Sequence, residues 1–228
     1  IRVKICSISE AAHALAAAEA GADYVGLNFV PGARRCLSEQ KANTIVKAYR
    51  HKHGRTRPRL VGIFADQPLE EVNRILDDCD LDMAQLSGSE PLEYCLAISR
   101  PVIKAVHVPL GQPFQQVVST LETILAKLEA ANILPLLDPD VAGAHGGTGA
   151  TFDWSIARDL GPMHQFLMGG GLTPENVAQA VREVGPWGVD VSSGVETGGL
   201  KDVEKIRAFV HEARKAEAQG QRSTDRGS

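Results

Sequence analysis

The chain has 228 residues, of which 43% are hydrophobic and 23% are charged. This composition indicates a globular protein and excludes a disordered, collagen-like or disulfide-stapled chain. The formal net charge of −4 gives no electrostatic reason to expect a nucleic acid as the main partner. No apolar run is long enough to span a bilayer and no signal-peptide pattern opens the sequence, so we expect a cytoplasmic protein that does not contact a membrane.

Four cysteines, Cys6, Cys36, Cys79 and Cys95, are scattered along the chain. Their spacing contains no CxxC pair, which argues against both a zinc site and a redox dithiol. We therefore expect reduced thiols and no metal centre.

Short apolar runs alternate with longer helical patterns along the sequence. The runs predict eight strands, at residues 3–6, 24–29, 60–65, 83–86, 102–108, 133–137, 165–168 and 188–191. The helical patterns lie at residues 9–20, 38–49, 69–77, 91–98, 114–130, 174–184 and 203–216, with only a short helix near 154–158. Such alternation is typical of parallel strands joined by crossover helices.

The number of repeating units favours a closed barrel. At about 28 residues per unit, a single (β/α)8 TIM barrel fits better than an open doubly wound sheet, which usually has five or six strands. We assign residues 1–216 to this one domain and residues 217–228 to a polar C-terminal tail that we expect to be disordered. In such barrels the active site lies at the C-terminal ends of the strands.

Two of these strand ends carry side chains suited to proton transfer. Cys6 ends the first strand, where a thiol that is simply part of the core is roughly twice as common as a catalytic one. Lys4, on the same face of that strand, would either stabilise a thiolate or be an ordinary lysine. Asp138 ends the sixth strand, and a loop cap and a general acid are about equally good interpretations of it.

Glycine-rich segments follow the seventh and eighth strands, at residues 168–172 and 191–195. Barrels commonly bind phosphate at these two strands through backbone N–H groups, and together the segments favour a phosphate site by roughly three to one. Arg35 is either a solvated charge or a bidentate partner for a carboxylate or phosphate. We assign no role to His107 or to His145, which lies in a further glycine-rich loop at residues 143–149.

At these positions the chain resembles the phosphoribosylanthranilate isomerase family of tryptophan biosynthesis, along nearly its full length apart from the tail. The resemblance is carried by several segments: Val-Lys-Ile-Cys (3–6), Arg-Cys-Leu-Ser (35–38), Gln-Leu-Ser-Gly (85–88), Gly-Gly-Thr-Gly-Ala-Thr-Phe-Asp-Trp (146–154), Gly-Gly-Leu-Thr-Pro-Glu-Asn-Val (170–177) and Val-Asp-Val-Ser-Ser-Gly-Val-Glu (189–196).

The resemblance implies a role for each candidate residue. In that family the cysteine at the end of the first strand is the general base and the aspartate at the end of the sixth is the general acid, which correspond to Cys6 and Asp138. The substrate-binding positions correspond to Arg35, on the anthranilate side, and Asp190. The phosphate site corresponds to the backbone near Gly170, Gly171, Ser193 and Gly194.

The implied reaction is an Amadori rearrangement of N-(5-phosphoribosyl)anthranilate to 1-(2-carboxyphenylamino)-1-deoxyribulose 5-phosphate. The expected partner is thus a small phosphoribosyl compound, and no cofactor is expected. Monomer and homodimer both remain open as the oligomeric state.

Three departures from the family pattern occur. Ser7 stands where the family usually has glycine, Ser87 stands where it usually has histidine, and the loop at residues 28–32 differs. The acid–base pair is untouched, whereas ligand contacts at the fourth strand are put in question.

Two other functions compete with this interpretation. The related sugar isomerase of histidine biosynthesis uses a pair of aspartates, one of them at the end of the first strand, and Cys6 at that place argues against it. A catalytically silent barrel that binds phosphate metabolites is the alternative from another class, because a fold does not fix chemistry.

Overall fold

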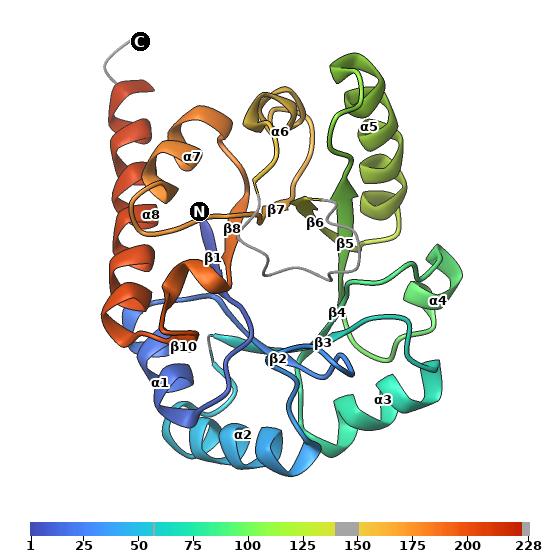
Figure 1. The fold of residues 1–228 in the computed structure, drawn as a ribbon, viewed down its shortest axis with the longest axis vertical. Coiled ribbons are helices and arrows are strands. Elements are labelled where there is room, and N and C mark those ends of the chain that lie inside the picture. Colours follow the sequence, from blue (N-terminus) through green and yellow to red (C-terminus); the bar gives the residue numbers. More distant parts are fainter. Residues whose placement is uncertain (57, 140–150, 225–228) are drawn as a thin grey trace.

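The chain forms a closed barrel of eight parallel strands in the order β1 to β8, surrounded by helices (Figure 1). This computed structural model describes residues 1–56, 58–139 and 151–224, so His145 and the loop at 143–149 lie outside the described residues. The predicted (β/α)8 barrel is confirmed. Within the described residues, no helix is both long and apolar enough to cross a membrane.

The eight barrel strands match the predicted positions closely. Their bounds are β1 Arg2–Ile5, β2 Tyr24–Asn28, β3 Arg59–Phe64, β4 Met83–Leu86, β5 Val102–Val108, β6 Leu134–Pro139, β7 Leu167–Met168 and β8 Gly188–Val191. The sixth strand extends beyond its predicted end, so Asp138 is held in the sheet rather than in a loop. The seventh is shorter than predicted.

The helices are α1 Ala11–Ala20, α2 Glu39–His53, α3 Leu69–Asp78, α4 Leu92–Leu96, α5 Phe114–Ala130, α6 Trp154–Leu160, α7 Val177–Val184 and α8 Val203–Thr224. The seventh begins three residues later than predicted, because Asn176 accepts a hydrogen bond from the Thr173 N–H and closes a turn there. The eighth continues through residues 217–224, where the sequence predicts a disordered tail; its Ala213 and Ala216 are buried.

A small antiparallel hairpin after β8 was not predicted from the sequence. A 3₁₀ turn, η1 (Ser193–Val195), leads into β9 (Glu196–Thr197), which pairs with β10 (Leu200–Lys201). Gly198 and Gly199 have φ values of 61° and 83°, the left-handed conformation that a two-residue hairpin turn requires. The hairpin lies beside the start of α8 (Figure 1).

The barrel interior is apolar in its part away from the C-terminal ends of the strands. Alternate residues of the central strands form one buried cluster inside the barrel, made of Val61, Met83, Ile103, Leu136 and Leu167. Since residues paired across neighbouring strands face the same side of the sheet, the strand register identifies the other inward-facing positions.

Nearer the C-terminal ends of the strands, the inward-facing positions become polar. They include Lys4, Gln85, His107, Asp138 and Asp190. The Lys4 ammonium is fully buried and lies 2.8 Å from Asp190 Oδ1. The inward-facing side chains thus form an apolar layer in the barrel interior and a polar layer above it, at the C-terminal ends of the strands.

The packing of side chains on the outer face of β3, between the barrel and its helices, can be tested by substitution. Phe64 is fully buried, and its ring stacks on Phe29 with 5.4 Å between the centroids. Phe64→Ala should lower the free energy of unfolding by about 3–5 kcal/mol, because it removes apolar contacts and leaves a cavity. Urea denaturation would measure this loss. The control Leu96→Ala, at a side chain that is 60% exposed, should change stability by less than about 0.5 kcal/mol. Equal effects would contradict this packing.

Candidate active site

Cys6 follows β1 directly and is buried at the C-terminal end of the barrel. Its backbone N–H donates to Val191 O at 2.8 Å, and its Sγ lies 3.7 Å from Ser7 Oγ. Ser7 has a φ of 56°, in the left-handed region that glycine adopts without strain. The backbone after Cys6 thus has the conformation that suits the glycine of the family pattern.

Burial is the main influence on the Cys6 thiol and raises its pKa above the ordinary value of 9.0. The charge of Asp190 raises the pKa further, whereas Lys4 and Lys201 lower it, as does the hydrogen bond with Ser7. The thiol of the free protein is therefore protonated at neutral pH, with two ammonium groups near enough to stabilise a thiolate.

Asp138 faces the interior of the barrel from β6, opposite His107 of β5 in the register. Desolvation raises its pKa to about 7, and the negative charge of Asp190 adds to the rise while Lys4 opposes it. Gly169 leaves room beside it, since a Cβ there would lie only 3.1 Å from Asp138 Oδ1. Asp138 thus holds its proton close to neutral pH, as a general acid must.

Arg35 lies in the loop after β2 and is not a solvated charge, since its side chain is only 13% exposed. Its Nη2 donates to Glu196 Oε2 at 2.7 Å. Its Nε lies 2.5 Å from Glu196 Oε1, but the N–H is too poorly aligned to count as a hydrogen bond. Sequence reasoning did not identify Glu196 as the partner of Arg35, although it is the last residue of the motif at 189–196.

The two glycine-rich segments meet at the barrel mouth. Gly170 and Gly171 have φ values of 82° and 63°, and Ser193 and Gly194 open the η1 turn. A Cβ on Gly194 would lie 1.9 Å from Leu172 O, so the segments approach each other closely only because this residue is glycine. The first N–H groups of such a turn have no intrahelical acceptor and are suited to bind an anion.

Ser87 and His107 lie where the fourth and fifth strands end. Ser87 is buried, its Oγ accepts a hydrogen bond from Gln85 Nε2 at 3.0 Å, and His107 Nε2 lies 3.2 Å from Ser87 O. The departure from the family's histidine thus places a small, buried hydroxyl at position 87.

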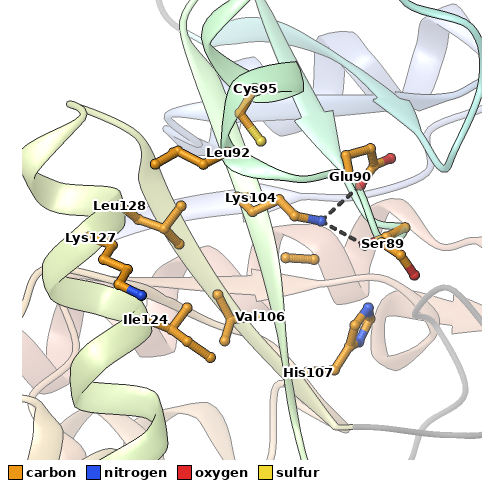
Figure 2. A pocket seen from close by; sticks show the side chains of 12 residues that line it. Ser89, Glu90, Leu92, Cys95, Lys104, Val106, His107, Ile124, Lys127 and Leu128 are labelled. Carbon is orange, nitrogen blue, oxygen red and sulfur yellow. Dashed lines mark hydrogen bonds and ion pairs between the residues drawn. The ribbon is translucent and has the colours of Figure 1, made fainter.

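A separate cavity of about 330 Å³ lies outside the barrel wall, between α4 and α5 (Figure 2). Leu92, Val106 and Leu128 point into it, and Lys104 reaches across it to Glu90 at 2.8 Å. Cys6 and Asp138 do not line this cavity. In the described ranges, no group of three His, Cys, Asp or Glu side chains is arranged to hold a metal ion.

The structure therefore brings a thiol, a carboxyl group of raised pKa, a largely buried arginine and a pair of glycine turns to the C-terminal ends of the strands. This arrangement is typical of a (β/α)8 barrel enzyme, in which ionisable side chains and glycine turns gather at the barrel mouth.

Comparison with known proteins identifies the family. The model described as N-(5'-phosphoribosyl)anthranilate (PRA) isomerase matches residues 3–212, and the chain belongs to this family of isomerases. An N-(5'-phosphoribosyl)anthranilate isomerase of Dehalococcoides mccartyi is 41% identical over 95% of this chain and 97% of that protein. The resemblance seen in the sequence is confirmed.

Solved structures agree with this assignment. Phosphoribosyl anthranilate isomerase from Thermotoga maritima has 34% identity and a TM-score of 0.77, over 94% of this chain and 99% of that one. A further structure, also 34% identical, with a TM-score of 0.73 and the same coverage, is an isomerase in complex with reduced 1-(o-carboxyphenylamino)-1-deoxyribulose 5-phosphate.

The raised pKa of Asp138 predicts that its carboxyl group lowers the free energy of unfolding increasingly as the pH rises. The pKa is about 7 in the folded protein and 3.8 ordinarily, so the native state loses stability relative to a neutral side chain as the pH rises through this interval. Asp138→Asn should stabilise the fold, and the gain should grow by about 3 kcal/mol between pH 5 and pH 8.5, because about two pKa units separate the cost at these two pH values. Urea denaturation at both pH values measures it.

The control for this experiment is Asp159→Asn, an exposed position on α6 where the same chemical change should give equal stability differences at the two pH values. An Asp138→Asn difference that is independent of pH would show that the carboxyl group is not desolvated.

Proposed function

We propose that this isomerase acts on N-(5'-phosphoribosyl)anthranilate, with Cys6 as general base and Asp138 as general acid. The observation that carries the assignment is the pKa of Asp138 at about 7, on the inward face of the barrel, in a site that shares its charged neighbours Lys4 and Asp190 with the Cys6 thiol. Because Lys4 and Asp190 shift the pKa values of both Asp138 and Cys6, the carboxylic acid and the thiol belong to the same site.

The proposed reaction is two linked proton transfers. Asp138 donates its proton to the furanose ring oxygen as the bond between C1′ and that oxygen breaks, which leaves a Schiff base at C1′. The Cys6 thiolate removes the C2′ proton, the electrons of that bond form an enolamine, and tautomerisation gives the ketone. Both residues exchange protons without a change in redox state.

The two ends of such a substrate fit the two ends of the site. A 5-phosphate suits the N–H groups near Gly170, Gly171, Ser193 and Gly194, and the carboxylate of the anthranilate ring suits Arg35. The 34% identical isomerase described above binds a compound that carries both groups, a carboxyphenylamino ring and a 5-phosphate. Asp190, paired with Lys4 between the two catalytic groups, is in place to accept a hydrogen bond from a ribose hydroxyl.

The acid–base pair can be tested by substitution. Cys6→Ser and Asp138→Asn keep the shape of each side chain but remove its proton-transfer chemistry, so each should lower kcat by about 10² or more. The decay of substrate fluorescence, with the substrate generated in situ, would measure turnover. Asp159→Asn serves again as the control and should match the wild type. Full activity in either catalytic variant would disprove its role, and no turnover by folded wild type would disprove the function.

The pKa values also predict an unusual pH profile. With Asp138 at about 7 and Cys6 above 9.0, the acid loses its proton before the base does, so the reactive form, thiolate plus carboxylic acid, is no more than about 1% of the singly protonated enzyme. We expect kcat/KM to rise up to about pH 7, to stay level and to fall above pH 9. If kcat/KM rose instead with a midpoint near pH 6, the titrating group would be the phosphate of the substrate, and the role of Asp138 in the profile would be contradicted.

A further inference from the structure

Glu196 of the β9–β10 hairpin is a buried carboxylate that takes no part in the proposed proton transfers. Its side chain is 6% exposed, and three cationic side chains lie against it, those of Arg34, Arg35 and Lys201. One buried carboxylate needs one well-placed cation to compensate its charge. The cluster therefore carries more positive charge than the stability of Glu196 requires.

Both carboxylate oxygens of Glu196 are shared between cations. Oε1 lies 3.2 Å from Lys201 Nζ and 2.5 Å from Arg35 Nε, and Oε2 accepts hydrogen bonds of 2.7 Å from Nη2 of both Arg34 and Arg35. Burial alone would raise the pKa of Glu196, but the hydrogen bond from Arg35 and the charge of Lys201 outweigh it and lower the pKa. Glu196 is thus ionised at neutral pH.

Glu196 fixes the direction of the Arg35 guanidinium. Because Nε and Nη2 face Glu196, the Nη1 edge is turned away from this carboxylate. No hydrogen bond joins Nη1 to another residue in the described part of the chain. This free edge is the part of Arg35 available to a second carboxylate, that of the substrate.

Lys201 connects the same carboxylate to the end of β8 that holds Cys6, since the Cys6 N–H donates to Val191 O and Ser192 is the next residue. Its side chain is 2% exposed, and its ammonium donates to Ser192 O at 2.7 Å besides contacting Glu196. Burial lowers the pKa of Lys201, and its interactions with Cys6 and Glu196 oppose that shift. The charged groups that act on the Cys6 thiol are Lys4 of β1, Asp190 of β8 and Lys201 of β10.

We propose that Glu196 is a positioning residue that directs Arg35 toward the carboxylate of the substrate and Lys201 toward the Cys6 thiol, so that one side chain couples substrate binding to the base. This inference rests on the proposed function, since it takes Arg35 and Cys6 in the roles given above. It adds Lys201 as a second ammonium group, beside Lys4, that stabilises the thiolate.

The first measurement does not depend on turnover. Iodoacetamide reacts with the thiolate, so the rate of Cys6 alkylation as a function of pH, followed by mass spectrometry of the peptide that contains Cys6, gives the midpoint of thiol ionisation. Lys201→Met should raise this midpoint by about 0.5 pH unit or more, because a nearby positive charge is lost. Lys201→Arg keeps the charge and should restore the wild-type midpoint.

Glu196→Gln should change two properties at once. KM should rise about tenfold, because Arg35 loses the partner that directs it. The alkylation midpoint should rise as for Lys201→Met but by less, because loss of Glu196 lowers the pKa of Lys201 further and its ammonium then loses its proton more readily at the alkaline pH where the thiol ionises. If this variant does not fold, Glu196→Asp tests the same point, since a carboxylate one methylene shorter cannot reach both cations.

The matched control is Glu90→Gln, which removes another buried carboxylate paired with a lysine, 2.8 Å from Lys104 (Figure 2). It should lower stability but leave KM and the Cys6 midpoint unchanged. A KM effect of Glu196→Gln without a shift of the midpoint would overturn the coupling, as would an unchanged midpoint in Lys201→Met. If the wild type did not turn over the substrate but the variants showed the expected shifts of the alkylation midpoint, the proposed function would be refuted. The electrostatic link between Glu196, Lys201 and Cys6 would still hold.

Discussion

The ion pair between Lys4 and Asp190 is the interaction on which both the barrel and its site depend. It joins the first strand to the last, with 2.8 Å between its atoms and the ammonium fully buried. Loss of either partner would leave an unpaired charge in the barrel interior, at a cost of about 3–5 kcal/mol. The same two charges shift the pKa values of Cys6 and Asp138, so barrel closure and acid–base chemistry share one pair of side chains.

Most of the fold could be predicted because its signals are local. Apolar runs and helical periodicity gave all eight barrel strands and their connecting helices, and Ser38 caps α2 through a hydrogen bond from the Lys41 N–H. The ends of elements were harder to predict where contacts distant in the sequence set them. Asp138 lies within β6 because His107 of the neighbouring strand pairs with it.

The site was only partly predictable for the same physical reason. The strand ends identified Cys6 and Asp138 as candidates, and the family resemblance gave them roles. The environment of Arg35 could not be read from the sequence, because its partner Glu196 lies 161 positions away. The hairpin that carries Glu196 has two very short strands, whose only local signal is the pair of glycines between them.

Pairing of β1 with β8 also affects how the protein folds during its synthesis on the ribosome. The strand that leads into Cys6 is synthesised well before its partner at residues 188–191 and the hairpin beyond it. Until then, Lys4 has no counter-ion and the edge of β1 is open on one side. The nascent chain must therefore carry an unfinished sheet while the residues between these two strands are made. The complete set of charges around the thiol assembles only after β8 and the hairpin have emerged.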